Sequence, residues 1–426
     1  MITVKKTLKR RLKQWHRYHF RFNLKKINRA HLLRIKEIRQ RGYANVLLIA
    51  SALPMWRLQG VYELLKKDSR FKVHVLVHPF YRLPEEEKQK AVEDLKACFD
   101  ASGVDYILCP TDDNELKALL ERLDPDILFY PQNYYGLFRD SLEWKCFKDR
   151  LLCYNNYGLS TIAAEWNYNT DYNNVAWRYY HATSLHLQTA KVLTYNKAKN
   201  AIVVGEARAD LFFAPVGEDP WKRINDGKTR KRVIFAPHFQ IQSNSVLNRA
   251  AFLWLSDFMI EMAEQYKDTL QFAFKPHPFL KTALYSHPDW GKEKTDAYYE
   301  KWATMPNTQL ETGTYIDLFK TSDAMIHNCG SFTGEYMFTG KPVLFTSKDW
   351  NEIYGSADDF GLKCLELHYK AGTTEEVKHF LDSVVLGDAD NLSEERQQFM
   401  KDYLIPPHGK TAAENIYEDL VNSLGF

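Results

Sequence analysis

One segment of the sequence combines small residues, hydroxyls and a carboxylate directly after an apolar stretch that predicts a strand, Ala324–His327. Small residues at a strand-to-helix turn let backbone N–H groups approach a phosphate at the start of the helix. Ser331 and Thr333 could add hydroxyl donors, and Glu335 could accept from ribose hydroxyls. An ordinary tight turn with a capping hydroxyl has the same composition. The phosphate-binding candidates here are Asn328, Gly330, Ser331, Thr333 and Glu335.

A second candidate is the pair Lys275 and His277, which follows the predicted strand Leu270–Phe274. A cation at this position can offset the charge of a diphosphate. The prolines at 276 and 278 restrict the backbone and so fix where the two side chains point. His277 is therefore predicted both to bind a donor and to take part in catalysis, although a histidine beside proline can also be purely structural.

Three shorter elements supply further candidates. His238 follows the predicted strand Val233–Ala236, and Arg208 follows Ala201–Gly205, where a guanidinium can bind phosphate through two hydrogen bonds. Lys410 precedes the last predicted helix. For Arg208 a surface ion pair with Asp210 is an equally good interpretation, and for Lys410 a proline stop followed by a capped helix is equally good.

These residues require a scaffold of parallel strands, and the chain alternates short apolar segments with helical ones. Two such series are separated by a polar, turn-rich hinge at 217–228. We therefore predict an α/β protein with two Rossmann-like domains facing a cleft, 42–222 for the acceptor and 223–426 for the donor with a closing C-terminal helix. Ligands bind beyond the carboxyl ends of strands in such sheets. Other predicted strands are Val46–Ser51, Val73–Val77, Tyr106–Cys109, Ile127–Pro131, Leu151–Tyr157 and Pro342–Phe345.

Composition narrows the function classes. The six cysteines contain no CxxC spacing, which argues against a disulfide framework or a structural zinc site and favours a reducing cytoplasm. No apolar run approaches the roughly 20 residues of a transmembrane helix, and no signal peptide is apparent. The GxGxxG, Walker, HExxH and GxSxG motifs are absent. We expect no metal.

Residues 1–41 form a basic arm, with fifteen Lys and Arg against the single acidic residue Glu37, in a chain of net charge +3. Apolar residues in the arm recur at helical spacing, at Leu8, Leu12, Trp15, Tyr18 and Phe22. This pattern predicts an amphipathic helix on an anionic membrane surface. Packing on its own domain is an alternative, and nucleic acid is disfavoured because the rest of the chain is acidic.

In this order, the motifs resemble those of the CDP-glycerol glycerophosphotransferase family, which makes teichoic-acid-like polymers. The matching residues are Gly205, Arg208, Asp210, Ala236, Pro237, Lys275, His277, Pro278, Asp317, Leu318, Ser322, Asp323, Ser331, Glu335, Lys341, Pro342, Gly409 and Lys410. The resemblance covers about residues 200–420.

The resemblance implies a GT-B-like fold, a CDP-polyol donor bound by the C-terminal half, no cofactor, and a cytoplasmic location on the inner face of the cell membrane. The implied reaction moves glycerol phosphate or a related polyol phosphate to a lipid-linked glycan or polymer acceptor. A GT-B glycosyltransferase using a CMP-, UDP- or GDP-linked sugar for capsule or lipopolysaccharide assembly is the alternative. A third hypothesis is that the chain is a non-catalytic binding protein.

The chain departs from the family pattern where a Trp-His-Gly element with the expected base would stand. Residues 155–160 read Asn-Asn-Tyr-Gly-Leu-Ser and contain no histidine. The nearby Glu165 is then the expected base, with His181 as a weaker alternative. The family's Asp before tandem serines is also replaced, by the sequence His327-Asn328-Cys329-Gly330-Ser331.

Overall fold

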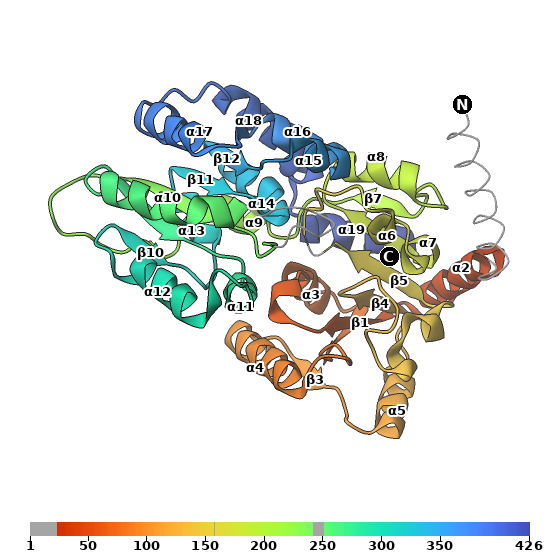
Figure 1. Ribbon diagram of the computed structural model, residues 1–426. Coiled ribbons are helices and arrows are strands. Elements are labelled where there is room, and N and C mark those ends of the chain that lie inside the picture. The colour runs from red at the N-terminus through yellow and green to blue at the C-terminus, as the bar shows by residue number, and fades with distance from the viewer. Residues whose placement is uncertain (1–23, 157, 242–250) are drawn as a thin grey trace, which may run out of the picture. The chain divides into compact units, whose positions relative to one another are not determined.

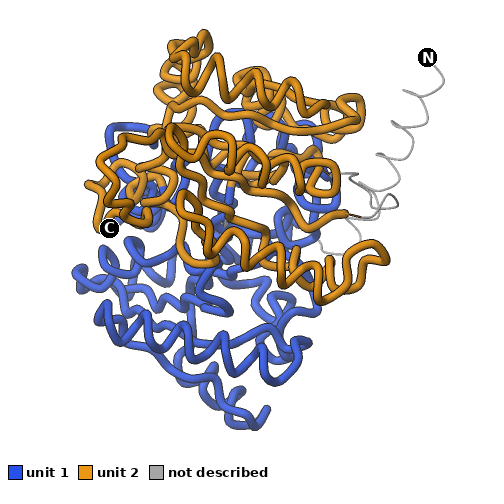
Figure 2. Tube along the Cα trace, turned by 60° about the vertical axis from the view of Figure 1, so that its left-hand side comes forward, with its two compact units in different colours: residues 1–158, 164–208, 406–426 blue, residues 159–163, 209–405 orange. Residues whose placement is uncertain are grey.

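The computed structural model describes residues 24–156, 158–241 and 251–426, which form two α/β units (Figure 2). Unit 1 contains the described residues up to 158 together with 164–208 and 406–426, and unit 2 contains 159–163 and 209–405. The chain therefore crosses between the units several times.

Unit 1 is built on a seven-stranded parallel sheet with the order β3-β2-β1-β4-β5-β6-β7 (Figure 1). Strand β1 (Ala44–Ala50), one of the inner strands, is an almost continuous buried apolar run, which is typical of a parallel strand covered on both faces. The strands are β1 (Ala44–Ala50), β2 (Phe71–Val77), β3 (Tyr106–Leu108), β4 (Ile127–Tyr130), β5 (Leu151–Asn155), β6 (Arg178–His181) and β7 (Ala201–Val203).

The helices of unit 1 include the last helix of the chain. They are α2 (Leu24–Arg41), α3 (Gln59–Lys67), α4 (Glu85–Ser102), α5 (Asp113–Leu123), α6 (Glu165–Tyr168), α7 (Asp171–Val175), α8 (Ser184–Leu193) and α19 (Ala412–Leu424). Helix α19 packs on α3, where a Cβ at Gly60 would lie 2.8 Å from Cβ of Ala413. In Figure 1 this blue helix lies among the red-to-yellow elements of unit 1.

The position of α19 differs from the expected domain 223–426, which included a closing C-terminal helix. Its apolar face belongs to the core of unit 1, because Ile416, Leu420 and Leu424 are buried in the same cluster as β1 and β2. Spacing along α19 predicts a buried face but does not say which sheet that face covers.

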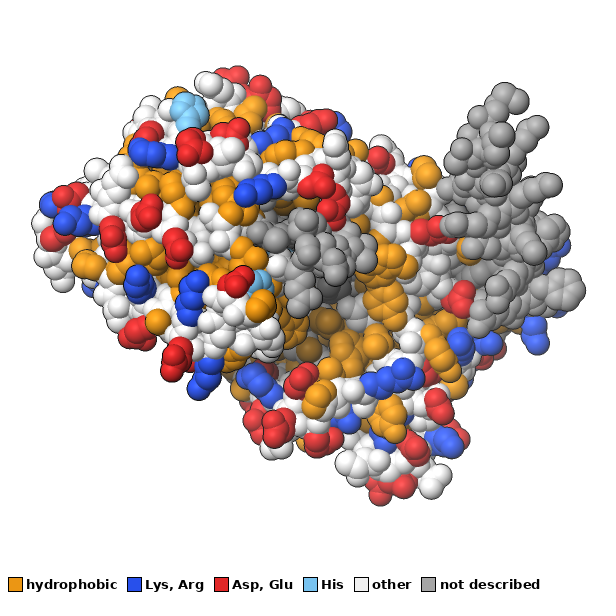
Figure 3. Space-filling model, viewed as in Figure 1, with side chains coloured by type: hydrophobic (Ala, Val, Ile, Leu, Met, Phe, Trp, Pro, Cys, Tyr) orange, Lys and Arg blue, Asp and Glu red, His pale blue; other side chains and the backbone are white. Residues whose placement is uncertain are grey.

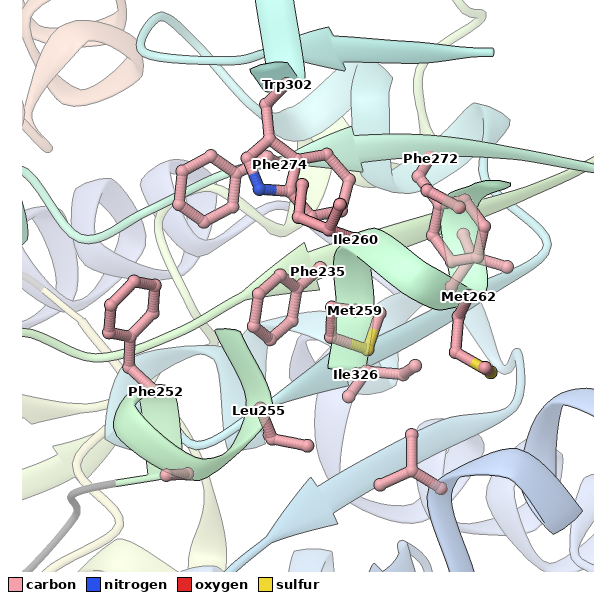
Figure 4. Close-up of a cluster of buried hydrophobic side chains, with 14 of the residues drawn as sticks. Phe235, Phe252, Leu255, Met259, Ile260, Met262, Phe272, Phe274, Trp302 and Ile326 are labelled. Atoms are coloured by element: carbon pink, nitrogen blue, oxygen red, sulfur yellow. The ribbon is translucent and has the colours of Figure 1, made fainter. Parts of the chain in front are cut away.

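Unit 2 has a six-stranded parallel sheet with the order β10-β9-β8-β11-β12-β13. Aromatic side chains fill one side of it (Figure 4), with Phe274 stacked on Trp302 at 5.1 Å between ring centroids. The strands are β8 (Lys231–Ala236), β9 (Leu270–Phe274), β10 (Thr308–Leu310), β11 (Ala324–His327), β12 (Val343–Thr346) and β13 (Tyr369–Ala371).

Ten α-helices accompany this sheet in the described part of unit 2. They are α9 (Ala209–Phe213), α10 (Ala251–Gln265), α11 (Leu280–Tyr285), α12 (Gly291–Thr304), α13 (Ile316–Thr321), α14 (Gly330–Glu335), α15 (Trp350–Ser356), α16 (Asp359–Glu366), α17 (Thr374–His379) and α18 (Ser393–Phe399).

Both sheets reverse their strand order once, between β1 and β4 in unit 1 and between β8 and β11 in unit 2. At such a switch point the two flanking crossovers run in opposite directions and leave a crevice at the carboxyl ends of the strands. The loops after β8 and β11 therefore define the place in unit 2 where a ligand is expected.

The expected amphipathic face at residues 8–22 lies outside the described residues. The rest of the predicted arm forms α2, which packs on unit 1 through buried Ile27 and Ile38. Arg39 also donates from Nε to the carbonyl of Leu424, at 2.7 Å. Residues 24–41 are thus part of unit 1. Within the described ranges, no helix has the length and apolarity to cross a bilayer.

Candidate functional site

A hydrogen bond joins the two loops at the switch point of unit 2. Asn328 directly follows β11, and its side-chain Oδ1 accepts the backbone N–H of His238, two residues beyond β8, at 2.7 Å. Asn328 is only 1% exposed, so the bond is shielded from water. The structure therefore brings together two candidates that are ninety residues apart in the sequence.

His238 and His277 share a local arrangement. Each ring accepts a backbone N–H at Nδ1 from the residue two positions later, at 3.3 Å from Gln240 and 3.2 Å from Phe279. An Nδ1 that accepts must carry a lone pair, so in the neutral ring the proton lies on Nε2. The ring centroids are 5.0 Å apart. The two neighbouring neutral rings thus each carry their hydrogen on Nε2.

The backbone holds His277 beside the end of β8. Its N–H donates to the carbonyl of Pro237 at 3.0 Å, while the N–H of Lys275 donates to Phe235 at 2.8 Å. Burial lowers the pKa of His277 to about 4. The imidazole is therefore neutral near pH 7, whereas the sequence suggested a positive charge there. A bound phosphate would raise this pKa, because a nearby anion favours the protonated ring.

Lys275 supplies the cation of this cluster. Its Nζ donates to the carbonyl of Gly313 at 2.9 Å and lies 5.4 Å from the centroid of the Tyr315 ring. Burial lowers the pKa of the ammonium. Tyr315 in turn donates its hydroxyl to Glu335, at 2.5 Å from Oε2. The Glu335 carboxylate is buried, and Tyr315 connects it to Lys275, a link the sequence analysis missed.

Helix α14 carries the small-residue candidates. Ser331 is exposed at its first turn, and Gly330 is partly exposed. Thr333 is buried and donates its hydroxyl to the carbonyl of Cys329 at 3.0 Å. Thr333 therefore bonds within its own helix here, whereas Ser331 faces solvent.

A short segment of chain, 159–163, belongs to unit 2 and supports α14. Thr161 donates its hydroxyl to the carbonyl of Gly330 at 3.1 Å. A Cβ at Gly361 would lie 2.3 Å from the carbonyl oxygen of Thr161, and one at Gly334 would lie 3.1 Å from Cβ of Leu159. The Thr161 backbone thus leaves no room for a Cβ at Gly361, and the side chains of Phe360 and Leu159 crowd the position at Gly334. Thr161 is a second residue missed from the sequence, because nothing local pairs it with Gly330.

The remaining donor-binding candidates, Arg208 and Lys410, lie in unit 1. Their two motifs meet there, since Gly205 adopts φ +103° and a Cβ on it would lie 2.5 Å from Cβ of Pro406. Arg208 is nearly buried, with Nε 3.6 Å from a carboxylate oxygen of Glu206. These residues follow β7 and precede α19.

Lys410 combines the features of a helix start with those of a binding candidate. Its ammonium pairs with Glu418, and Thr411 caps α19 through a capping box with Glu414. The structure therefore contains the capped helix that was the alternative interpretation of this segment. The ammonium of Lys410 is exposed, so the capped helix does not exclude a role for this residue in binding.

The two candidate bases differ in exposure. Glu165 is exposed at the start of α6, and Asn169 donates to its Oε1 at 3.4 Å. His181 is fully buried, and its ring lies 4.0 Å from that of Tyr179 and 6.3 Å from that of Tyr168, centroid to centroid. Burial lowers the pKa of His181 to about 3. Its burial separates His181 from any acceptor, so Glu165 remains the expected base.

Surface charge and groups that could hold a metal ion are two further features of a functional site. On the face shown in Figure 3, Lys and Arg side chains of described residues alternate with Asp and Glu and form no continuous basic patch. Among residues 24–156, 158–241 and 251–426, no group of three or more His, Cys, Asp or Glu side chains is placed to hold a metal ion.

Two Rossmann-like units, each with a single switch point in its sheet, define a GT-B-type fold. The family model for CDP-glycerol:poly(glycerophosphate) glycerophosphotransferase matches residues 155–422, more than half of the chain. The protein belongs to this family and is a transferase. No curated protein shows a significant sequence match to the chain.

Solved structures share the fold at low sequence identity. The UDP complex of Staphylococcus aureus MnaA is 13% identical, with a TM-score of 0.56, and the match covers 90% of this chain and 97% of that one. A putative UDP-N-acetylglucosamine 2-epimerase from Listeria monocytogenes is 14% identical, at 0.58, covering 89% and 96%. The UDP-GlcNAc 2-epimerase of Neisseria meningitidis, bound to UDP-GlcNAc, is 14% identical, at 0.56, covering 88% and 99%.

Proposed function

We propose that the protein transfers glycerol phosphate, or a related polyol phosphate, from a CDP-linked donor to a membrane-associated glycan or polymer acceptor. The product belongs to a teichoic-acid-like or capsule-type cell-surface polymer. Family membership supports the transferase class, and the contacts at the switch point of unit 2 support a diphosphate-bearing donor.

The observation that carries the proposal is the cluster of donors at that switch point. His238 and His277 each have Nδ1 occupied by a backbone N–H, which leaves Nε2 as the hydrogen-bearing atom of the neutral ring. Lys275 adds a positive charge held by a backbone carbonyl. Donors fixed before the reaction stabilise charge that develops on a diphosphate without reorganising.

The proposed chemical step is attack by an acceptor hydroxyl on the β-phosphorus of the donor. The new bond joins the acceptor oxygen to that phosphorus, and the bond from the β-phosphorus to the bridging oxygen breaks, so CMP leaves. The acceptor proton passes to a base, for which we propose Glu165. Hydrogen bonds from His238, His277 and Lys275 offset the charge on the diphosphate oxygens.

The remaining donor-binding candidates take supporting roles in the proposal. Ser331 is exposed at the start of α14, where Gly330 is partly exposed, and both are proposed to add donors to the same phosphates. Asn328 holds His238 in place, and Glu335 accepts from Tyr315, through which it is proposed to support Lys275 in the donor site. Arg208 and Lys410 are proposed to contact the donor as well, as the family pattern implies.

The acceptor and the location are inferred from the basic arm and from the family. Eight of the fifteen basic residues of the arm lie in 1–23 and suit an anionic bilayer surface, where each basic residue close to the surface contributes roughly 1 kcal/mol of attraction. A lipid-linked acceptor would be presented at the inner face of that membrane. We therefore propose a peripheral, cytoplasmic enzyme.

The nucleotide that appears during turnover tests which bond breaks. With CDP-glycerol and a membrane extract, attack at the β-phosphorus releases CMP, whereas attack at the glycerol carbon releases CDP. Chromatography of the nucleotide products separates the two. CMP formation that requires both acceptor and Lys275 supports the proposal; CDP as the product would contradict it.

A further inference from the structure

A cavity of about 570 Å³ lies in unit 1, at the amino ends of β6 and β7. Three stretches of chain form its walls: the start of α2, the connection from α7 to β6, and the turn at 194–200 that precedes β7 (Figure 1). Its volume is within the range of small-molecule sites. The lining residues are Leu24, Lys25, Asn28, Asn174, Ala176, Trp177, Arg178, Tyr195, Asn196, Lys197, Lys199 and Asn200.

The charged side chains of this lining are all positive. Lys25, Lys197, Lys199 and Arg178 contribute to it, and its members include no aspartate or glutamate. Arg178 is neutralised by Asp419, with Nε 2.8 Å from Oδ2. Within the described part of the chain, no carboxylate lies in ion-pair distance of the three lysines. The described lining therefore carries three lysines that have no carboxylate of the described residues within ion-pair distance.

The turn that presents two of these lysines is strained. Lys197 and Ala198 adopt φ +55° and +53°, in the left-handed region that non-glycine residues disfavour. Such conformations persist only where the surroundings hold them, and they cluster at functional sites.

Asparagine side chains hold the turn in place. Asn196 accepts the backbone N–H of Ala198 at 2.8 Å and donates to the side chain of Asn200, also at 2.8 Å. Asn174 accepts the N–H of Asn196 at 3.0 Å and receives the Asn196 side chain at its carbonyl. Asn200 in turn donates to the carbonyl of Ala176 at 2.7 Å. The network fixes the backbone from which Lys197 and Lys199 extend.

We propose that this cavity binds a phosphate group. Three lysines from two different elements surround it, and compact ammonium groups bind phosphate as point charges. Trp177 and Leu24 add an apolar wall, which suits a phosphate joined to a larger organic group. The cavity opens at the amino ends of the strands, the edge opposite to the carboxyl ends where ligands of such sheets react. The site is thus a second one, independent of the proposed transfer.

The test uses the full-length protein and isothermal titration with two soluble probes. One probe is inorganic phosphate, and the other is dihexanoyl phosphatidylglycerol below its micelle concentration. The site variant is Lys197→Gln/Lys199→Gln. The control, Lys117→Gln/Lys267→Gln, removes two exposed lysines outside the cavity and the same net charge. Thermal unfolding checks that each variant is folded.

We expect saturable binding of at least one probe, at least tenfold weaker in the site variant and changed less than twofold in the control. Similar binding of both probes identifies free phosphate as a sufficient ligand, and binding of the lipid alone identifies a headgroup. Lys25→Gln, on a different wall, should weaken binding at least threefold even if the turn variant fails to fold. No saturable binding, or equal losses in site and control variants, would overturn the proposal.

Discussion

The fully buried His181 provides a quantitative test of how unit 1 is built. Burial lowers its pKa to about 3, compared with about 6.5 in an unfolded chain. Neither ring nitrogen has a hydrogen-bond partner. As the pH falls below 6.5, the unfolded chain binds a proton that the folded chain does not, so stability is lost from pH 6.5 down to about 3. His181→Phe keeps a ring between Tyr168 and Tyr179 and removes this titration.

The size of the effect follows from the two pKa values. At pH 5 the unfolded-state protonation of His181 costs about 2 kcal/mol, and at pH 7.5 it costs less than about 0.1 kcal/mol. The larger phenyl ring adds a packing cost that does not depend on pH. The free energy of unfolding of the variant, relative to that of the wild type, should therefore increase by about 2 kcal/mol between pH 7.5 and pH 5. Two kcal/mol corresponds to roughly 4–8 °C in a unit of this size.

Thermal unfolding at the two pH values measures this double difference, and transfer activity at pH 7.5 is measured alongside. Tyr168→Phe is the matched control, because it changes the same aromatic stack without a group that titrates in acid. An unchanged difference at pH 5 would refute the burial argument. Loss of catalysis in a stably folded His181→Phe would show instead that this histidine acts in the reaction.

Three further substitutions, two of them paired with a control variant, test unit 2. Lys275→Met should lower kcat/KM for the donor roughly 10–100-fold in steady-state assays, because a charge-assisted hydrogen bond contributes about 1.5–3 kcal/mol. An unchanged kcat/KM would show that Lys275 does not contact the donor. Asn328→Ala should destabilise unit 2 by about 1–3 kcal/mol and weaken donor binding, because the N–H of His238 loses its acceptor. Urea unfolding measures the loss of stability, and calorimetry measures donor binding. The control variant Asn328→Asp keeps an acceptor and should lose less stability. Gly361→Ala should destabilise by about 1–3 kcal/mol, because the new methyl group meets the Thr161 carbonyl. The control variant Gly355→Ala, which places its methyl group in open space in α15, should stabilise the protein by up to about 1 kcal/mol. Equal effects of Gly361→Ala and Gly355→Ala on the free energy of unfolding would contradict the packing described.

Strands with strong apolar patterns could be predicted closely from the sequence. Leu270–Phe274 and Ala324–His327 match β9 and β11 residue for residue, since buried parallel strands read as continuous apolar runs. The missed strands β6, β10 and β13 are only three or four residues long. In β6 the sequence Arg-Tyr-Tyr-His carries no aliphatic run, and its burial comes from tertiary packing.

Long-range contacts explain what the sequence could not show about the site. Motifs after strands identified Lys275, His277 and Asn328, because the carboxyl ends of parallel strands share one edge. Thr161 reaches Gly330 only because the chain crosses into unit 2 for five residues, and no local signal marks that crossing. The neutral state of His277 likewise depends on burial by distant residues.

The most direct test of the central claim is the nucleotide released when the purified protein is given a panel of donors with a membrane extract. The panel contains CDP-glycerol, CDP-ribitol, a CMP-sugar, a UDP-sugar and a GDP-sugar. The account predicts CMP from a CDP-polyol, no consumption of the sugar nucleotides, and loss of turnover in Glu165→Ala. Intact CDP-polyols together with consumption of a sugar nucleotide would contradict it and indicate a GT-B glycosyltransferase.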